Sequence, residues 1–195
     1  MLLTSPEVEF AVLETARGGI LKRGLAFDSC SVGVVLNVSA DHLGLDGIET
    51  IEDLTRVKAV VALAASRAVV LNADEKQCVA IGAMLGAGIE QIWFSMDPDN
   101  HVLLRHLERH GRAAWFQEGS LIVDNGELRS HLLATASMPA SMNGHARYNV
   151  ANGLAAASAL MGAGSATSKS PAGWQVLYRT PAAIRCARTS IMRTV

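Results

Sequence analysis

Residues 31–75, "SVGVVLNVSADHLGLDGIETIEDLTRVKAVVALAASRAVVLNADE", contain a complete strand–helix–strand unit. The two ends of this stretch, residues 31–37 and 68–75, are short runs rich in Val and Leu that end in polar residues. Such runs suit strands of a parallel sheet, which are buried on both faces. Residues 50–65 between them are long enough for the helix that a parallel connection needs. The stretch therefore predicts an α/β fold.

The start of the helix at residues 50–65 has a recognisable sequence. Thr50 is a suitable N-cap, and Asp53 follows three residues later, where a capping-box carboxylate lies. Acidic residues in the first turn also interact favourably with the helix dipole. We therefore expect the helix to begin directly after Thr50.

The same alternation continues on both sides of this unit. Residues 9–14, "EFAVLE", and residues 89–95, "IEQIWFS", predict further strands, and residues 75–88 predict a helix that closes on glycine. This rhythm predicts a mostly parallel sheet flanked by helices, in the doubly wound manner.

The period changes after residue 112. Apolar alternation in residues 113–133 surrounds the pair Asn125-Gly126, which predicts a small β-hairpin region. An Ala-rich helix is then expected within residues 144–164. We predict one domain over residues 1–163, followed by a poorly ordered basic tail at 164–195.

The composition argues against a membrane-spanning, secreted or disulfide-rich protein. Half of the 195 residues are apolar, but no apolar run approaches the roughly 20 residues of a membrane helix. Glu7 and Glu9 stand where a signal peptide would have its apolar segment. The three cysteines form no CxxC pair, so neither a disulfide framework nor a zinc site is indicated. A cytoplasmic protein without membrane contact is expected.

Charge is distributed unevenly along the chain. Residues 1–127 carry 10 basic and 18 acidic side chains, whereas residues 128–195 carry 7 basic side chains and no acidic ones. The arginines of the second part are thinly spread and lack aromatic residues between them. We therefore do not expect nucleic acid as a partner.

Two polar clusters follow the first two predicted strands, where open α/β sheets place their ligands. Glu14 closes the strand before a turn with Arg17 and two glycines, and could be a magnesium ligand or an ordinary polar strand end. Asp41 and His42 follow the next strand. His42 could bind a metal with Asp41 supporting it, or the pair could form a turn before a helix.

Two further candidates follow along the chain. Lys58 lies inside the predicted helix, where a lysine is usually solvated. Asn72 and Asp74 end the next predicted strand, and their cluster could contact a ribose or cap the helix that follows. From the residues alone the structural alternatives remain open at every one of these sites.

Taken together, four stretches resemble the Mur-ligase-like part of the cyanophycin synthetases: "VLETARGGILKRGL", "GVVLNVSADHLGLDGIETIEDLTRVKAVV", "AVVLNADE" and "NGHARYNVANGLAAASAL". The resemblance covers roughly residues 5–163. It implies the central domain of an ATP- and Mg²⁺-dependent acid–amino-acid ligase, which activates a carboxylate as an acyl phosphate that an amine displaces. In the intact family enzyme, arginine is added to aspartate side chains of a polymer.

The resemblance also implies roles for individual residues. Glu14 and His42 match magnesium ligands, and Lys58 matches a lysine that is carbamylated in several Mur ligases. His42 and Lys58 would thus belong to the catalytic machinery. Asn149 and Asn152 match asparagines near the adenine. Asn72, from its position at a strand end rather than from the resemblance, is a further candidate for binding the nucleotide.

The chain also departs from the family pattern. The phosphate-binding loop of a Mur ligase ends in Gly-Lys-Ser/Thr, and no Gly-Lys dipeptide occurs in this sequence. The ATP-grasp region and the C-terminal domain of the family enzyme are not matched either. We therefore expect a truncated central domain that is inactive alone. The alternatives are a nucleotide-binding or interaction remnant that works with another chain, and a non-functional truncated product. A homo-oligomer is also compatible with the sequence.

Overall fold

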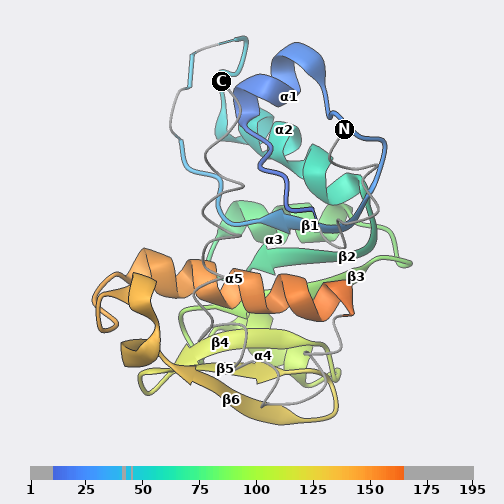
Figure 1. Ribbon diagram of the computed structural model, residues 1–195. Helices are drawn as coiled ribbons and strands as arrows, with labels where there is room; N and C mark the ends of the chain where they lie inside the picture. The colour runs from blue at the N-terminus through green and yellow to red at the C-terminus, as the bar shows by residue number, and fades with distance from the viewer. Residues whose placement is uncertain (1–10, 41–42, 45, 165–195) are drawn as a thin grey trace.

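The computed structural model describes residues 11–40, 43–44 and 46–164 (Figure 1). Asp41 and His42 lie outside the described residues, and so do residues 165–195 of the predicted tail.

The described residues form one six-stranded sheet whose strands lie in sequence order. The first four strands are parallel, and the last two are joined to them by antiparallel pairing. The strands are β1 (Cys30–Val35), β2 (Ala65–Asn72), β3 (Glu90–Ser95), β4 (Ala113–Gln117), β5 (Ser120–Asp124) and β6 (Arg129–Ala134). The mostly parallel α/β sheet predicted from the sequence is confirmed.

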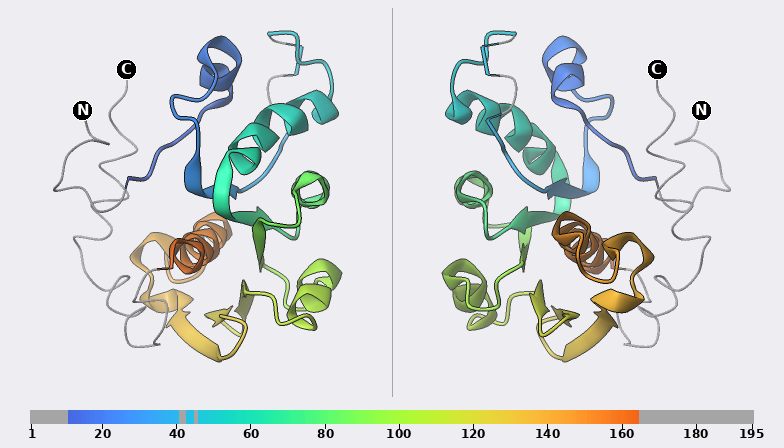
Figure 2. Two further views of the ribbon diagram at one scale, coloured as in Figure 1. Left: turned by 90° about the vertical axis from the view of Figure 1, so that its right-hand side faces the viewer. Right: turned by 90° about the vertical axis from the view of Figure 1, so that its left-hand side faces the viewer.

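Helices cover both faces of this sheet (Figure 2). The three crossover helices α2 (Ile51–Leu63), α3 (Lys76–Met84) and α4 (His101–Leu107) lie on one face, and α5 (Arg147–Ala163) lies on the other. The described strands are added in one direction, so this part of the chain lacks the reversal of strand order that defines a doubly wound sheet. The short helix α1 (Arg17–Arg23) contacts α2.

Alternate residues of the central strands supply two apolar layers. In β2, Val69 and Leu71 belong to the layer under α2 and α3, whereas Ala68 and Val70 belong to the layer under α5. This is the period of two expected when both faces of a strand are buried. The strand was recognisable from its sequence for this reason.

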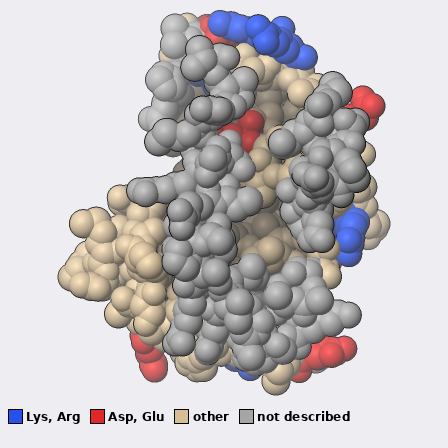
Figure 3. All heavy atoms as spheres, viewed as in Figure 1, with Lys and Arg blue, Asp and Glu red and all other residues tan. Residues whose placement is uncertain are grey.

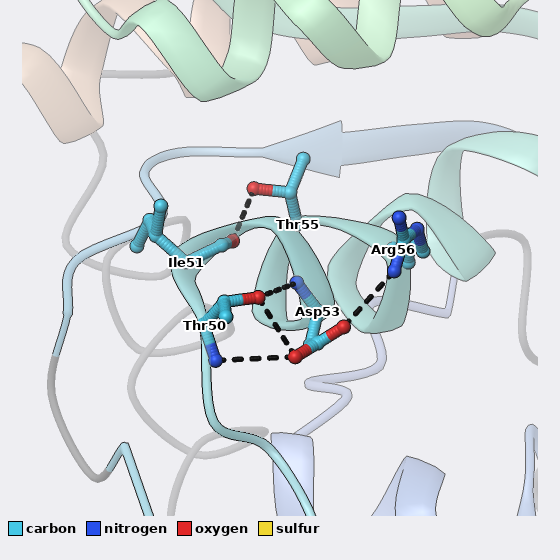
Figure 4. Close-up of polar contacts among 5 residues, drawn as sticks. All are labelled: Thr50, Ile51, Asp53, Thr55 and Arg56. Atoms are coloured by element: carbon cyan, nitrogen blue, oxygen red, sulfur yellow. Dashed lines mark hydrogen bonds and ion pairs between the residues drawn. The ribbon is translucent and has the colours of Figure 1, made fainter.

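The predicted start of α2 is confirmed in detail (Figure 4). The backbone N–H of Asp53 donates to the Thr50 hydroxyl over 3.1 Å, and the Thr50 N–H donates to the Asp53 carboxylate over 3.1 Å. These reciprocal bonds satisfy two donors that the first helical turn leaves without partners. The Thr50 hydroxyl also donates to the Asp53 carboxylate over 2.7 Å, and this bond, followed by that from the Thr50 N–H, lowers the pKa of the Asp53 carboxyl.

The hairpin predicted at Asn125-Gly126 is also confirmed, as the connection between β5 and β6. The Asn125 side chain accepts hydrogen bonds from the N–H groups of Glu127 and Leu128, and Gly126 adopts a φ of 90°. A second tight turn, between β4 and β5, has both central residues in the left-handed region, Glu118 at 49° and Gly119 at 75°. That conformation matches the twist of a hairpin.

The strand predicted at residues 9–14 is wrong for its described part. Residues 11–16 form no strand, and Val12 and Leu13 are 72% and 46% exposed. The described sheet ends at β1, so no strand beside this segment pairs with its backbone. An apolar, β-branched run needs such a neighbour to become a strand.

Two local predictions need correction as well. Arg17 and the two glycines after it belong to α1 rather than to a turn. The helix α4 was not predicted, although Asn100 caps it through bonds from the N–H groups of Val102 and Leu103. With only seven residues, α4 is too short to show a helical period.

No helix in the described part of the chain is long and apolar enough to cross a membrane. On the face shown in Figure 3, the described Lys and Arg side chains lie in separate groups near the edges. They do not form a continuous basic surface on that face.

Candidate functional site at the carboxyl edge of the sheet

The candidate residues gather at the carboxyl edge of the parallel strands. β1, β2 and β3 end there, at Val35, Asn72 and Ser95. The helix α5 runs antiparallel to these strands. This direction follows from its last carbonyl groups, which accept hydrogen bonds from residues at the amino ends of two strands. Arg67, in β2, donates to the Ala163 carbonyl over 3.2 Å, and Arg112, just before β4, donates to that of Met161 over 2.6 Å. The first turns of α5 therefore lie at the carboxyl edge.

Lys58 and Asn72 converge on the chain as it leaves β1. The Lys58 ammonium, on α2, donates to the carbonyl of Asn37 over 2.8 Å. The Asn72 side-chain amide, at the end of β2, donates to the carbonyl of Leu36 over 3.0 Å. Two side chains from different elements thus hold two consecutive carbonyl groups. This pair of contacts is called the β1-exit clamp below.

Asp74 anchors the neighbouring strand end. Its carboxylate accepts hydrogen bonds from the Ser95 hydroxyl over 2.5 Å, from the Met96 N–H over 2.7 Å and from the Asn100 amide over 3.0 Å. The Asp74 N–H in turn donates to the Asn72 side-chain oxygen over 3.0 Å, which orients the Asn72 amide toward β1. Asp74 therefore joins the ends of β2 and β3 to the start of α4.

This arrangement corrects one prediction. Of the two alternatives for the cluster at residues 72–75, the helix cap does not form, because the N-cap residue of α3 is Glu75 and no side-chain cap bond is made there. The Asp74 carboxylate is directed to β3 instead. The sequence contained one signal for this network: Asn100 stands after "DPD", where an N-cap is common.

The segment with Glu14 is tied to the loop after β1. Arg17, three residues after Glu14, forms an ion pair with Asp46 over 3.6 Å, and the Arg17 side chain is only 15% exposed. Asp46 lies in a turn stabilised by the Gly44 N–H, which donates to the Ile48 carbonyl over 2.7 Å. The Glu14 residue itself is exposed. The segment of the first predicted cluster is therefore tied to the loop after β1 by an ion pair that neither motif suggested.

Asn149 and Asn152 lie in the first two turns of α5, at the same edge but on the other face of the sheet. The Asn149 amide donates to the Ala140 carbonyl over 2.7 Å, whereas Asn152 is exposed. Both asparagines therefore lie in the part of α5 that is at the carboxyl edge.

Comparison with known proteins gives the family. The model of the Mur ligase middle domain matches residues 1–160, most of the chain. This chain belongs to the Mur ligase middle-domain family. It is similar to the cyanophycin synthetases of Crocosphaera subtropica and Synechocystis sp., each 46% identical, and of Geminocystis herdmanii, 44% identical, in each case over 158 residues. These alignments cover 80% of this chain and 18% of each relative, so the chain spans less than a fifth of their length.

The donor chemistry of this Mur ligase middle domain can be compared with the needs of Mg²⁺. Within residues 11–40, 43–44 and 46–164, no three His, Cys, Asp or Glu side chains gather into a group that could hold a metal ion. Asp74 is occupied by its three donors, whereas Glu14 offers an exposed carboxylate, the ligand type that Mg²⁺ prefers. Glu14 therefore fits a magnesium ligand by its chemistry.

The cysteine near this edge of the Mur ligase middle domain, Cys78, is not suited to act as a nucleophile. Cys78, on α3, is fully buried, with its sulfur 3.7 Å from the carbonyl oxygen of Val35. Burial raises the pKa of this thiol to about 11. A thiol in that state is protonated at neutral pH and is a poor nucleophile.

Proposed function

We propose that this chain forms the metal-side and adenine-side parts of the nucleotide site of an ATP-dependent, amide-forming ligase of the cyanophycin synthetase kind. The observation that carries the proposal is the β1-exit clamp of Lys58 and Asn72 at the carboxyl edge. Together with the Arg17–Asp46 ion pair, it holds the chain on both sides of the Asp41-His42 loop. The 46% identity to cyanophycin synthetases supports the assignment of the reaction.

When bound, magnesium and ATP supply the phosphoryl group that activates a carboxylate toward an amine. In this proposal Glu14 and His42 bind the metal, and Asn149 and Asn152 bind the adenine. Lys58 is then a positioning residue, because its ammonium holds the Asn37 carbonyl and thereby fixes the start of the metal loop. The substrate class is an aspartate- and arginine-containing polymer, which comes from the likeness to the cyanophycin synthetases.

The phosphate-binding loop sets a limit on what these residues do alone. A Gly-Lys dipeptide, which such a loop requires, occurs nowhere in the 195 residues. We therefore expect these residues on their own to bind nucleotide weakly and not to hydrolyse it. Activity would require a phosphate-binding loop in the same or another polypeptide.

Paramagnetic Mn²⁺, used in place of Mg²⁺, tests the metal side of the proposal by NMR. We expect Mn²⁺ to broaden the backbone amide signals of Glu14 and Asn37 and to leave those of β6 unchanged. Glu14→Gln should abolish the broadening, whereas Glu127→Gln, on the exposed hairpin turn, should preserve it. Broadening that survives Glu14→Gln, or that is centred elsewhere, would show that the metal site is wrong.

A phosphate-release assay tests the limit on activity. The purified chain, given ATP, magnesium, arginine and an aspartate polymer, is expected to release no phosphate above background. Turnover that disappears in His42→Ala would show that these residues suffice for catalysis, and would refute the expected dependence on a separate phosphate-binding loop.

A further inference from the structure

Tyr148 differs from the other aromatic residues of the described chain. Trp93, Phe94 and Trp115 are buried, with 5%, 1% and 3% exposure, whereas Tyr148 is 69% exposed. Phe116 is partly buried, and the Arg147 guanidinium lies 5.9 Å from its ring centre. Tyr148 is therefore the most exposed aromatic ring among the described residues, and it lies in the first turn of α5.

Helical geometry groups Tyr148 with the two asparagines. At about 100° per residue, Asn152 projects roughly 40° from Tyr148, and Asn149 projects roughly 100° from it. Asn152 thus lies between the other two around the helix axis, one turn further along. The opposite side of the helix is occupied by Val150 and Leu154, which are 1% and 0% exposed. One side of α5 therefore carries the exposed Tyr148 ring and the exposed Asn152 amide, with the half-buried Asn149 beside them, whose amide nitrogen is bonded to the Ala140 carbonyl and whose side-chain oxygen can accept.

This combination of groups suits a flat heteroaromatic base. An asparagine amide can donate to and accept from the edge of a purine, as it does with adenine in nucleic acids. An exposed aromatic ring offers a face on which the same base stacks. Aromatic and amide groups on one side of a helix can therefore hold the face and the edge of one base.

We propose that the Tyr148 ring is the stacking surface for the purine base of the nucleotide, next to the edge-reading amides of Asn149 and Asn152. This inference rests on the proposed function, because it takes the two asparagines as the adenine side of the site. It adds a residue that determines affinity for the base itself, independently of phosphate and metal.

Titration of the full 195-residue chain with adenosine, followed by saturation-transfer NMR, tests the inference without phosphate or metal. We expect Tyr148→Ala to weaken adenosine binding about fivefold or more, the usual effect of removing a stacking partner. Tyr148→Phe keeps the ring and should bind within about twofold of the unmodified chain. Leu128→Ala, which removes an exposed apolar side chain from the distant hairpin, should change nothing.

The possible outcomes separate the two proposals. If adenosine binds and Asn149→Ala weakens the binding but Tyr148→Ala does not, the stacking role of Tyr148 is wrong. The assignment of the two asparagines to adenine binding is then supported. If adenosine does not bind at all, or if substitution of neither asparagine changes the affinity for adenosine, the adenine-binding part of the proposed function is wrong. The stacking role of Tyr148 is then wrong as well. Circular dichroism of each variant would verify that the fold is retained.

Discussion

Lys58 donates a hydrogen bond to the carbonyl oxygen of Asn37 over 2.8 Å, which joins the middle of α2 to the chain leaving β1. Lysine on a helix is usually solvated, so this fixed contact is a structural role that its sequence position does not reveal. The ammonium of Lys58 therefore fixes the backbone at the point where the chain leaves β1.

Lys58→Met should lower the free energy of unfolding by about 1 kcal/mol, the usual net worth of one hydrogen bond. Methionine keeps most of the aliphatic stem, so the change isolates the ammonium. Lys22→Met, at an exposed position of α1, is the control and should have no effect. Urea unfolding measures both, and equal stabilities of the two variants would contradict the role of the clamp.

Asp74→Ala should be more damaging, at about 2 kcal/mol or more. It leaves the Met96 N–H without its acceptor and removes a charged acceptor from the fully buried Ser95 hydroxyl and from the Asn100 amide, which keep only the backbone carbonyls of Asp97 and Ala73. Asp99→Ala removes a carboxylate from the same acidic loop, at an exposed position, and should change stability by less than about 0.5 kcal/mol. If thermal unfolding gives the two variants the same stability, the Asp74 network is not what joins β2 to β3.

Gly82→Ala tests the packing of α3 on the sheet. A methyl group at Gly82 would lie 2.8 Å from the Trp93 ring and 3.1 Å from Leu71, so we expect a loss of about 1–3 kcal/mol from overpacking. Gly19→Ala is also a helical glycine substitution but meets nothing within 4 Å, and it should stabilise the protein slightly. A stabilising Gly82→Ala, measured in urea, would show that the helix can move away from the strand.

His106 should make stability depend on pH. Burial lowers its pKa below the ordinary value of 6.5, while the Arg112 carbonyl and Glu90 act in the opposite direction. The folded protein therefore favours the neutral ring, so the unfolded chain takes up the proton first as pH falls. Stability should be complete above the unfolded pKa and should decline as pH falls from there toward the folded pKa.

The measurement is urea unfolding at about pH 7.5 and about pH 5.5, on either side of the ordinary histidine pKa. His106→Gln should reduce the loss of stability between these pH values. The exposed His131→Gln should leave that loss unchanged. If His106→Gln shows the same loss as the unmodified protein, another group is responsible.

The sequence was most informative where a local pattern and the final environment agree. Thr50 and Asp53 form their cap from residues three positions apart, and residues 68–71 of β2 are apolar because both faces of the strand are covered there. The segment at residues 11–14 has a similar apolar sequence, but a strand also needs a neighbouring strand to pair with. The local sequence does not show whether such a neighbour is present.

The candidate site, like the fold, was predicted from the sequence only in part. The sequence predicted that Lys58 would lie within a helix and Asn72 at the end of a strand, as the structure has them. It did not predict that their partners would be the backbone carbonyls of Asn37 and Leu36. Nor did it predict the Arg17–Asp46 pair, since long-range partners depend on how α1 packs. Contacts of this kind follow from the tertiary arrangement and cannot be read from spacing.

The position of α5 has a consequence for the order in which the protein can fold during synthesis. This helix packs against β1 to β5 on one face of the sheet, yet it comes after all six strands in the chain. Val70, Phe94 and Leu121 therefore lack their cover until the ribosome has made residues 147–163. From the synthesis of the strands until that of α5, the growing chain must carry an uncovered apolar sheet face, a state that is prone to aggregation and that chaperones shield.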